Sequence, residues 1–585
     1  MKFGIGNCLT RLTKRRPNKI YLKAFACLVV ALPILTPRLA RAAENLRFNY
    51  GVLEFSLSID SLERYAQTGE IDSELNFYTK RLDDKRTKQL RRILSRQINI
   101  NPVLLYRLTR SPMIVEIIES LGEVATTHRG HNGFYALRGS ITNAAIAKQD
   151  RGITLIDIMR KFPTQDIQID VAKLMQLSNE LTALVEYREA IRELVIQRAD
   201  RETNSKIGNS FLPQKDLRTS GGIAFTTQTI KIDSRIADKN SGIRSREPFR
   251  AKLYLPKSLT KPAPIVVLSH GFGSEPKAFD YLGKHLASYG IAAVSVEHIG
   301  SDSDYELEIL AGAKTQALAS SEFIERPLDI HYVLDELERL NQSDPLLQGT
   351  LDVNRVGAIG HSLGGYTALT LAGAEINSPR LRQQCPRKKI SLNMSSLMQC
   401  RAKNLVPQQE LADSRIKAAI AISPISSKIH GQESLSQISV PTAIISGSED
   451  IIAPVVQEQI YPFTWLSSTD KYLAMMIPGD HFSASSLPRA KPANPTVIEE
   501  FVLKDTATHI GKRLADGKPY IKAFTVAFVK AYVEEDSEYL SYLTASYARN
   551  ISDSKVDFNV IRSLDLESLE RKYQDILPVI LPTLN

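Results

Sequence analysis

Cysteine and tryptophan are scarce in this chain, and the cysteines are not arranged to hold a metal. The 585 residues include four cysteines and one tryptophan. Cys8 and Cys27 lie near the N-terminus, and neither Cys385 nor Cys400 has the neighbouring ligands that a metal-binding spacing requires. We therefore expect no metal and no other cofactor.

Long apolar runs are absent beyond residue 43, so we expect no membrane-spanning segment in the mature chain. Residues 1–43 are predicted to be a secretory signal peptide. Basic residues precede an apolar core at Ala24–Leu35, and Ala40–Ala42 offers an Ala-x-Ala cleavage site, with cleavage expected after Ala42 or Ala43. An uncleaved anchor is the alternative. The pair Arg15-Arg16 leaves the choice between the Sec and twin-arginine routes open.

A surplus of one charge sign is also missing from the mature chain. The formal charge is +10, but residues 1–43 hold nine lysines and arginines and no acid, so the rest of the chain carries +1. A nearly neutral protein has no electrostatic reason to bind nucleic acid or an anionic membrane. We expect an exported protein, in the periplasm or outside the cell. Its partner is expected to be a small molecule or a lipid, and its oligomeric state stays open.

The most informative motif that is present lies at 360–364, which reads Gly-His-Ser-Leu-Gly. It follows a short apolar segment, 355–359, and precedes a helical pattern, 365–372. Between a strand and a helix, Gly-x-Ser-x-Gly forms a sharp turn that exposes the serine hydroxyl, and its glycines allow the turn to pack closely. Ser362 is therefore the candidate nucleophile for cleavage of an acyl bond. A serine in an ordinary turn is the alternative.

An acid and a histidine follow Ser362 in the order that such a catalytic triad requires. Asp450 comes shortly after the apolar run 441–446, and His481 comes shortly after the apolar run 472–477. The histidine would take the serine proton during attack, and the carboxylate would orient the imidazole ring. Glu449 is the alternative acid, because sequence alone does not distinguish neighbours in one loop.

Two backbone N–H groups are candidates for the oxyanion hole. One belongs to Leu363, the residue after the nucleophile. The other is assigned to Phe272, because 270–274 reads His-Gly-Phe-Gly-Ser directly after the apolar run 265–269. Loss of one such donor costs about 3 kcal/mol of activation free energy. A plain glycine turn is the alternative for this loop.

The segments around these motifs predict one mostly parallel sheet. Runs at 265–269, 291–296 and 416–422 are almost continuously apolar, which is typical of strands that are covered on both faces. Helical patterns fall between the strands, as right-handed crossovers require. The candidate site residues all follow strand ends, which is where open α/β sheets place their sites.

Four segments carry a resemblance to a known superfamily: 269–273, Arg326-Pro327-Leu328-Asp329, 360–365 and 447–454. Residues from about 220 to 540 resemble the α/β-hydrolases, and in particular the platelet-activating-factor acetylhydrolase, dienelactone hydrolase and cutinase-like polyesterase group. The loop 447–454 resembles the acid loop of the polyesterases. The acetylhydrolases carry their acid one strand earlier, where this chain has Ser423-Pro424-Ile425 and no carboxylate. The whole chain is similar to an exported cyanobacterial α/β-hydrolase family whose N-terminal domain has no assigned function.

The predicted fold class is therefore α/β, an α/β-hydrolase fold preceded by a separate all-α domain. Helical spacing of leucines and tyrosines predicts the all-helical domain at 44–205, which shows no repeats and no catalytic pattern. A linker is expected at 206–222, the catalytic domain at 223–545, and a C-terminal tail at 546–585. In the tail of the catalytic domain, Phe524–Tyr532 is expected to cover the sheet.

A polar insertion at 375–414 interrupts the catalytic domain and contains Cys385 and Cys400. An even pair of cysteines in an exported protein predicts one disulfide bond, with two free thiols as the alternative. We interpret the insertion as a cap that shapes substrate entry. The alternative is an excursion that makes no contact with the site.

The sequence thus predicts an exported serine hydrolase of carboxylic esters, either lipid esters or short-chain acyl esters. A serine peptidase of the same fold and a non-catalytic binding or scaffold protein remain alternatives. The identity of the acyl chain and the role of the helical domain stay open.

Overall fold

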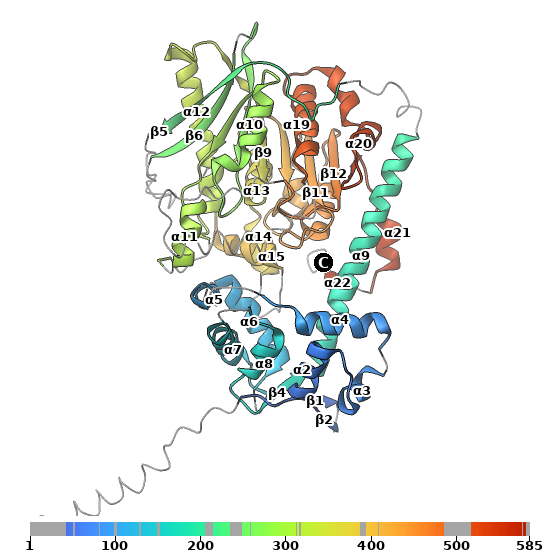
Figure 1. Ribbon diagram of the computed structural model, residues 1–585. Coiled ribbons are helices and arrows are strands. Elements are labelled where there is room, and N and C mark those ends of the chain that lie inside the picture. The colour runs from blue at the N-terminus through green and yellow to red at the C-terminus, as the bar shows by residue number, and fades with distance from the viewer. Residues whose placement is uncertain are drawn as a thin grey trace, which may run out of the picture.

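A nine-stranded sheet forms the centre of the protein. The computed structural model describes residues 42–580 except 51–52, 81, 99–101, 111, 128–129, 149–151, 205–214, 234–247, 258, 312, 315–317, 386–392, 408, 485–515 and 576. The strand order is β13-β12-β11-β10-β9-β7-β8-β6-β5. Figure 1 labels β5, β6, β9, β11 and β12 of this sheet. The strands are β5 (Phe225–Ile232), β6 (Phe249–Pro256), β7 (Ala263–Ser269), β8 (Ala292–Val296), β9 (Leu351–His361), β10 (Ile416–Ile422), β11 (Thr442–Gly447), β12 (Lys471–Ile477) and β13 (Asp557–Ile561).

The inner six strands, from β8 to β12 in sheet order, run parallel, and the strands at both edges are antiparallel to their neighbours. Every residue of β7, β8 and β11 is buried, because helices cover both faces of the sheet. The predicted α/β class, with a mostly parallel sheet flanked by helices, is confirmed.

Helices cover both faces of the large sheet. On one face, Leu268 and Ile420 share a core with residues of α10, α19 and α20. On the other, Val267 packs with residues of α12 and α13, and Leu473 packs with residues of α17. The helices are η3 (Pro276–Phe279), α10 (Asp280–Ala287), α11 (Ser303–Ala311), α12 (Glu322–Ser343), α13 (Leu363–Leu371), α14 (Ser378–Gln384), α15 (Met394–Gln399), η4 (Cys400–Asn404), α16 (Gly431–Leu435), η5 (Val456–Ile460), α17 (Tyr461–Trp465), α19 (Lys518–Tyr532), η6 (Ser537–Leu543), α20 (Ala545–Ile551), α21 (Glu567–Lys572) and α22 (Leu577–Ile580).

The predicted C-terminal tail at 546–585 is not a tail over most of its length. Strand β13 pairs antiparallel with β12 and closes one edge of the sheet. Phe558 and Val560 of this strand are buried in the same core as Phe524 and Phe528 of α19. Helix α19 does cover the sheet, as its apolar pattern predicts.

The front part of the chain, residues 42–170, is not all-helical as predicted. It contains a four-stranded sheet in the order β2-β1-β4-β3. Its core includes Leu57, Tyr65 and Phe162. Its elements are β1 (Asn45–Tyr50), β2 (Leu53–Ser58), α2 (Ile59–Thr68), α3 (Ser73–Thr79), α4 (Asp84–Ser95), α5 (Pro102–Leu108), α6 (Pro112–Val124), β3 (Ala125–Thr126), α7 (Phe134–Ala147), α8 (Leu155–Arg160) and β4 (Asp166–Asp170).

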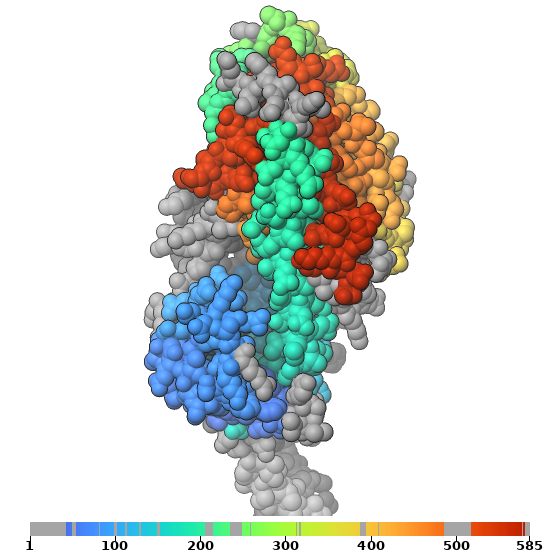
Figure 2. Space-filling model, turned by 90° about the vertical axis from the view of Figure 1, so that its right-hand side faces the viewer, coloured from blue at the N-terminus to red at the C-terminus, as the bar shows by residue number. Residues whose placement is uncertain are grey.

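One long helix joins the front part to the large sheet. Helix α9 (Val171–Thr203) starts directly at the end of β4, where the Asp170 side chain accepts a hydrogen bond from Lys173 N at 3.0 Å. Its later residues Tyr187, Ile191 and Val195 are buried in the core that also holds α17 and β12. Figure 2 shows the outer face of α9, which runs from the front part up between C-terminal segments of the chain. The expected boundary at 205 is therefore wrong, because α9 is part of the layer that covers the large sheet. Of the expected linker at 206–222, residues 206–214 lie outside the described residues, and Leu217 is fully buried.

The insertion at 375–414 is closed by an internal disulfide bond and joined to the rest of the large-sheet part by a buried carboxylate. Cys385 and Cys400 form the predicted disulfide bond, 15 residues apart, which stabilises a loop of this length by about 3 kcal/mol in the entropic model. Buried Glu458 accepts hydrogen bonds from Gln399 Nε2 at 2.9 Å and from Ser426 N at 2.8 Å. The front part contacts the insertion through α6 and α15, and it also contacts helix α11 through α5 (Figure 1). No helix within the described ranges is both long and apolar enough to cross a membrane.

Candidate active site

Ser362 lies on the sharp turn between β9 and α13. Its backbone has φ 56° and ψ −117°, a conformation that residues with a side chain rarely adopt. A Cβ on Gly360 would lie 1.9 Å from Gly364 O, and a Cβ on Gly364 would lie 1.9 Å from Ser269 O. Only glycine fits at either position. The motif therefore forms the tight turn that its spacing predicts.

Asp450 and His481 meet at the ends of neighbouring strands β11 and β12. The Asp450 Oδ2 and His481 Nδ1 atoms are 2.9 Å apart, and both side chains are buried. Backbone N–H groups of Ile452 and Ala453 donate to Asp450 Oδ1, and Gln459 Nε2 donates to Oδ2 at 2.9 Å. These donors fix the carboxylate in one orientation.

Glu449, the alternative acid, points elsewhere. Its Oε2 atom lies 3.0 Å from Arg188 Nη1 of helix α9. Asp450 is therefore the acid that the structure brings to the imidazole of His481.

The Ser362 turn and the His481 loop are in direct contact. His361 Nε2 bonds with the backbone oxygen of His481 at 2.8 Å, and the two imidazole rings are 4.8 Å apart between centroids. Within the described part of the chain, the half-buried Ser362 hydroxyl makes no hydrogen bond. Catalytic hydrogen bonds are often long without substrate and shorten when it binds.

The loop after β7 approaches the serine at the position expected for an oxyanion hole. A Cβ on Gly271 would lie 3.3 Å from Ser362 Cβ and 3.1 Å from His361 Nδ1. Phe272 follows in this loop and packs against the cluster that contains Leu363. The two residues assigned to the oxyanion hole thus lie against one apolar cluster beside Ser362.

A buried polar network under this loop escaped sequence analysis. His298 joins Ser269 Oγ at 2.9 Å and Asp329 Oδ2 at 2.8 Å, and all three side chains are buried. Arg326, also buried, donates to the backbone oxygen of His270 at 2.5 Å. The histidine and aspartate side chains of this second Ser-His-Asp set are fully buried. The set therefore stabilises the loop and does not contact a substrate. In the sequence, the only sign of this network is the Arg326–Asp329 segment. Its partners lie on β7 and after β8, and they can be identified only once the fold is known.

Burial keeps several histidines around the site neutral. Burial, with the nearby His481 as a smaller cause, lowers the pKa of His361 to about 3. Burial and the Arg326 guanidinium hold the pKa of His270 well below its ordinary value. Neither ring carries a charge near neutral pH, so neither competes with His481 as a proton carrier.

Acidification is expected to destabilise the fold through such histidines. Burial lowers the pKa of His285 and of His430 to about 4, and that of His361 to about 3, whereas histidine in an unfolded chain titrates near 6.5. The unfolded chain therefore binds these protons first. The contribution of these histidines to the free energy of unfolding is fully present above about pH 6.5. Below that pH the free energy of unfolding falls toward pH 4, by roughly 1.4 kcal/mol per pH unit for each histidine. Urea unfolding at several pH values between about 7.5 and 5 measures this slope.

A single substitution provides the control for this pH dependence. His285 Nε2 contacts the backbone oxygen of Leu217 at 2.9 Å, and a glutamine amide can donate the same bond. His285→Gln should therefore keep the fold. It should reduce the pH dependence of the free energy of unfolding by the contribution of one histidine. An unchanged slope would contradict the assignment of that proton to His285.

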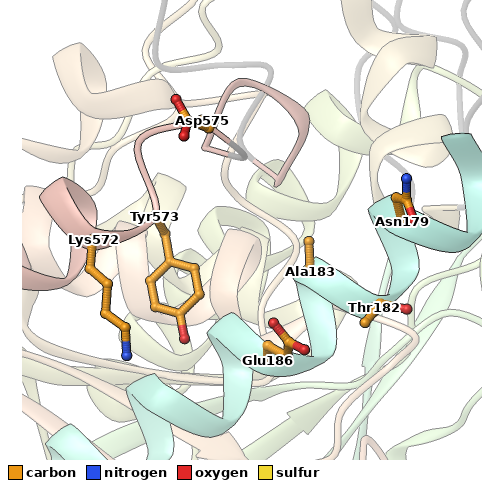
Figure 3. Close-up of a pocket in the computed structure, with 7 residues that line it drawn as sticks. All are labelled: Asn179, Thr182, Ala183, Glu186, Lys572, Tyr573 and Asp575. Atoms are coloured by element: carbon orange, nitrogen blue, oxygen red, sulfur yellow. The ribbon is translucent and has the colours of Figure 1, made fainter.

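Two hollows in the described surface lie away from the candidate triad. One, of about 250 Å³, lies between α9 and the segment around α21 and is lined by Glu186, Lys572 and Tyr573 among others (Figure 3). The other, of about 430 Å³, is lined by residues of α12 and the end of β5. Among the described residues, no group of three or more His, Cys, Asp and Glu side chains is placed to hold a metal ion.

Comparison with known families adds one finding. Residues 42–170 match the family described as "Alpha/beta hydrolase of unknown function (DUF1400)". The match covers the front part, while the large sheet that gives the chain its α/β-hydrolase architecture lies outside it. Fold and match together indicate an α/β hydrolase of unknown function. A search of the curated proteins found no match.

Proposed function

We propose that the protein is an exported serine hydrolase that cleaves carboxylic esters through an acyl-enzyme. The Ser362 hydroxyl attacks the ester carbonyl carbon while His481 Nε2 takes its proton. The tetrahedral intermediate collapses, and the alcohol leaves with the proton from His481. Water, deprotonated by His481, then releases the acid from Ser362 Oγ. Asp450 holds the imidazole in the required tautomer and stabilises the imidazolium.

One observation carries this proposal. The 2.9 Å contact between Asp450 and His481 lies on the loops after β11 and β12, next to the strained turn of Ser362. The N–H groups of Phe272 and Leu363 are the proposed donors to the oxyanion, each worth about 3 kcal/mol of transition-state stabilisation. The packing of Phe272 and the insertion into one apolar cluster with Leu363 supports the interpretation of the insertion as a cap.

The proposed substrates are lipid esters or short-chain acyl esters, as in the acetylhydrolase, dienelactone hydrolase and polyesterase group that the chain resembles. Export is supported by the signal-like residues 1–43 and by the Cys385–Cys400 bond, since disulfides persist in oxidising compartments. Ala43 is buried in the core of the front part, which favours cleavage after Ala42 over cleavage after Ala43.

Covalent labelling tests the nucleophile directly. A fluorophosphonate is expected to add once to the folded protein, and peptide mass spectrometry should place the adduct on Ser362. Heat-unfolded protein should carry no adduct, because activation of the hydroxyl needs the folded site. A folded protein without an adduct, or with one on another serine, would contradict the proposal and favour a binding role.

The substrate class is tested by p-nitrophenyl esters of increasing acyl length, alongside matched p-nitroanilides. We expect turnover of the esters and not of the anilides. Preference for acetate over long acyl chains would favour the acetylhydrolase-like relatives. Efficient cleavage of anilides would favour the serine peptidase instead.

A further inference from the structure

The acid loop, residues 448–450 after β11, is held from two sides by backbone contacts and one ion pair. Glu449 N donates to the backbone oxygen of Gly479 at 2.7 Å, which joins the acid loop to the loop that carries His481. The backbones touch here, because a Cβ on Gly447 would lie 2.6 Å from the carbonyl carbon of Gly479. Glu449 therefore links the acid loop directly to the loop that carries His481.

The Glu449 side chain is held by helix α9, which begins directly after the front part. Arg188 Nη1 lies 3.0 Å from Glu449 Oε2, and the side chains are only 20% and 26% exposed. Arg188 Nη2 also donates to Glu189 at 3.0 Å, so the guanidinium is held between two carboxylates. The next residue along the acid loop, Ile451, is 74% exposed, so apolar packing does not anchor the loop on that side.

Helix α9 is firmly packed where it meets this loop. Tyr187, next to Arg188, is fully buried, shares a 2.8 Å hydrogen bond with the Tyr461 hydroxyl and packs edge-on against Tyr573. At its other end the helix is tied to the front part by a 2.6 Å ion pair between Lys173 and Glu123 of α6. A fully exposed ion pair contributes little to stability. The Arg188–Glu449 pair is mostly buried, and its arginine lies on a helix that is held at both ends.

We propose that Arg188 is a positioning residue of the active site, through which helix α9 holds Glu449 and thereby the loops of Asp450 and His481. The front part and its helix then belong to the catalytic unit rather than forming a separate binding domain. This inference rests on the proposed function, since it assigns a role within the same triad.

Arg188→Ala and Glu449→Gln test the proposal on p-nitrophenyl acetate. A misplacement of about 1 Å in the acid and histidine loops lowers kcat by roughly 10- to 100-fold, while KM should change by less than about two-fold because the substrate contacts are kept. Arg192→Ala is the matched control. Arg192 lies one turn further along α9 and pairs with Glu189 at 2.7 Å, and this variant should retain wild-type kcat.

Charge reversal separates positioning from general stability. The double variant Arg188→Glu with Glu449→Arg should recover most of the kcat that either single reversal loses. Wild-type kcat in Arg188→Ala, an equal loss in Arg192→Ala, or no recovery in the double reversal would each overturn the inference. These results differ from a failure of the proposed function, in which the wild-type protein itself would show no turnover.

Discussion

Replacement of Ser362 by alanine is expected to lower kcat/KM for p-nitrophenyl acetate by about 10⁶-fold. Without the hydroxyl no acyl-enzyme forms, and His481 and Asp450 have no proton to move, so the triad fails as a unit. The residual rate should stay above that of water, because the proposed oxyanion donors and the binding contacts remain. Steady-state assays at high enzyme concentration measure this loss.

A second serine on the same edge of the sheet provides the control. Ser423 follows β10 and, like Ser362, has a positive φ, of 44°. Ser423→Ala therefore places alanine in a comparably unusual backbone conformation without touching the proposed nucleophile. It should change kcat/KM by less than about three-fold. A Ser362→Ala variant that keeps its turnover, with unchanged thermal unfolding, would rule out the proposed nucleophile.

The strands that carry the site were predictable because their sequences allow few alternatives. Strands β7, β8, β10, β11 and β12 are short apolar runs, which are typical of a sheet covered on both faces. Each candidate residue follows one of these strands or β9, so the order of the motifs along the chain already placed them at one edge. The disulfide followed from the even number of cysteines.

The edge strands and the front sheet were missed because their patterns are weak. Strand β5 reads FTTQTIKI and is mostly half-buried or exposed, and β13 has only five residues. Each becomes recognisable as a strand only when its pairing with a neighbouring strand of the folded sheet is known. In the front part, charged residues interrupt the strands, and helical spacing was the stronger local signal.

Helix α9 shows why the sequence did not reveal its role. Its apolar spacing at Leu174, Leu177, Leu181, Leu184 and Val185 predicts a buried stripe, yet three of these side chains (174, 181 and 185) are exposed and the other two are only half-buried. The buried residues instead recur every fourth position, from Ala183 through Tyr187 to Ala199, and include small side chains. The large sheet selects that stripe, so tertiary packing overrides the local pattern. The same dependence on distant partners hid the Arg188–Glu449 pair and the Ser269–His298–Asp329 network.

Replacement of Asp450 by asparagine is expected to lower kcat by about 10⁴-fold with little change in KM. The N–H groups of Ile452 and Ala453 donate to Oδ1, so the amide oxygen of the asparagine must take that position. The amide nitrogen then replaces Oδ2 and faces both Gln459 Nε2 and His481 Nδ1. A donor at that point forces the hydrogen of the neutral imidazole onto Nε2. In that tautomer, His481 cannot accept the proton of Ser362.

Asp480→Asn is the matched control, because Asp480 lies next to His481 in the chain. Its Oδ1 accepts from Phe482 N at 3.0 Å and from Ser483 Oγ at 2.9 Å, and an asparagine oxygen keeps both bonds. Its kcat should fall by less than about ten-fold. Measurement of kcat at pH 7 to 9 for both variants tests the tautomer argument, since the Asp450→Asn loss should persist across this range. Equal losses in the two variants would mean that Asp450 does not orient the ring.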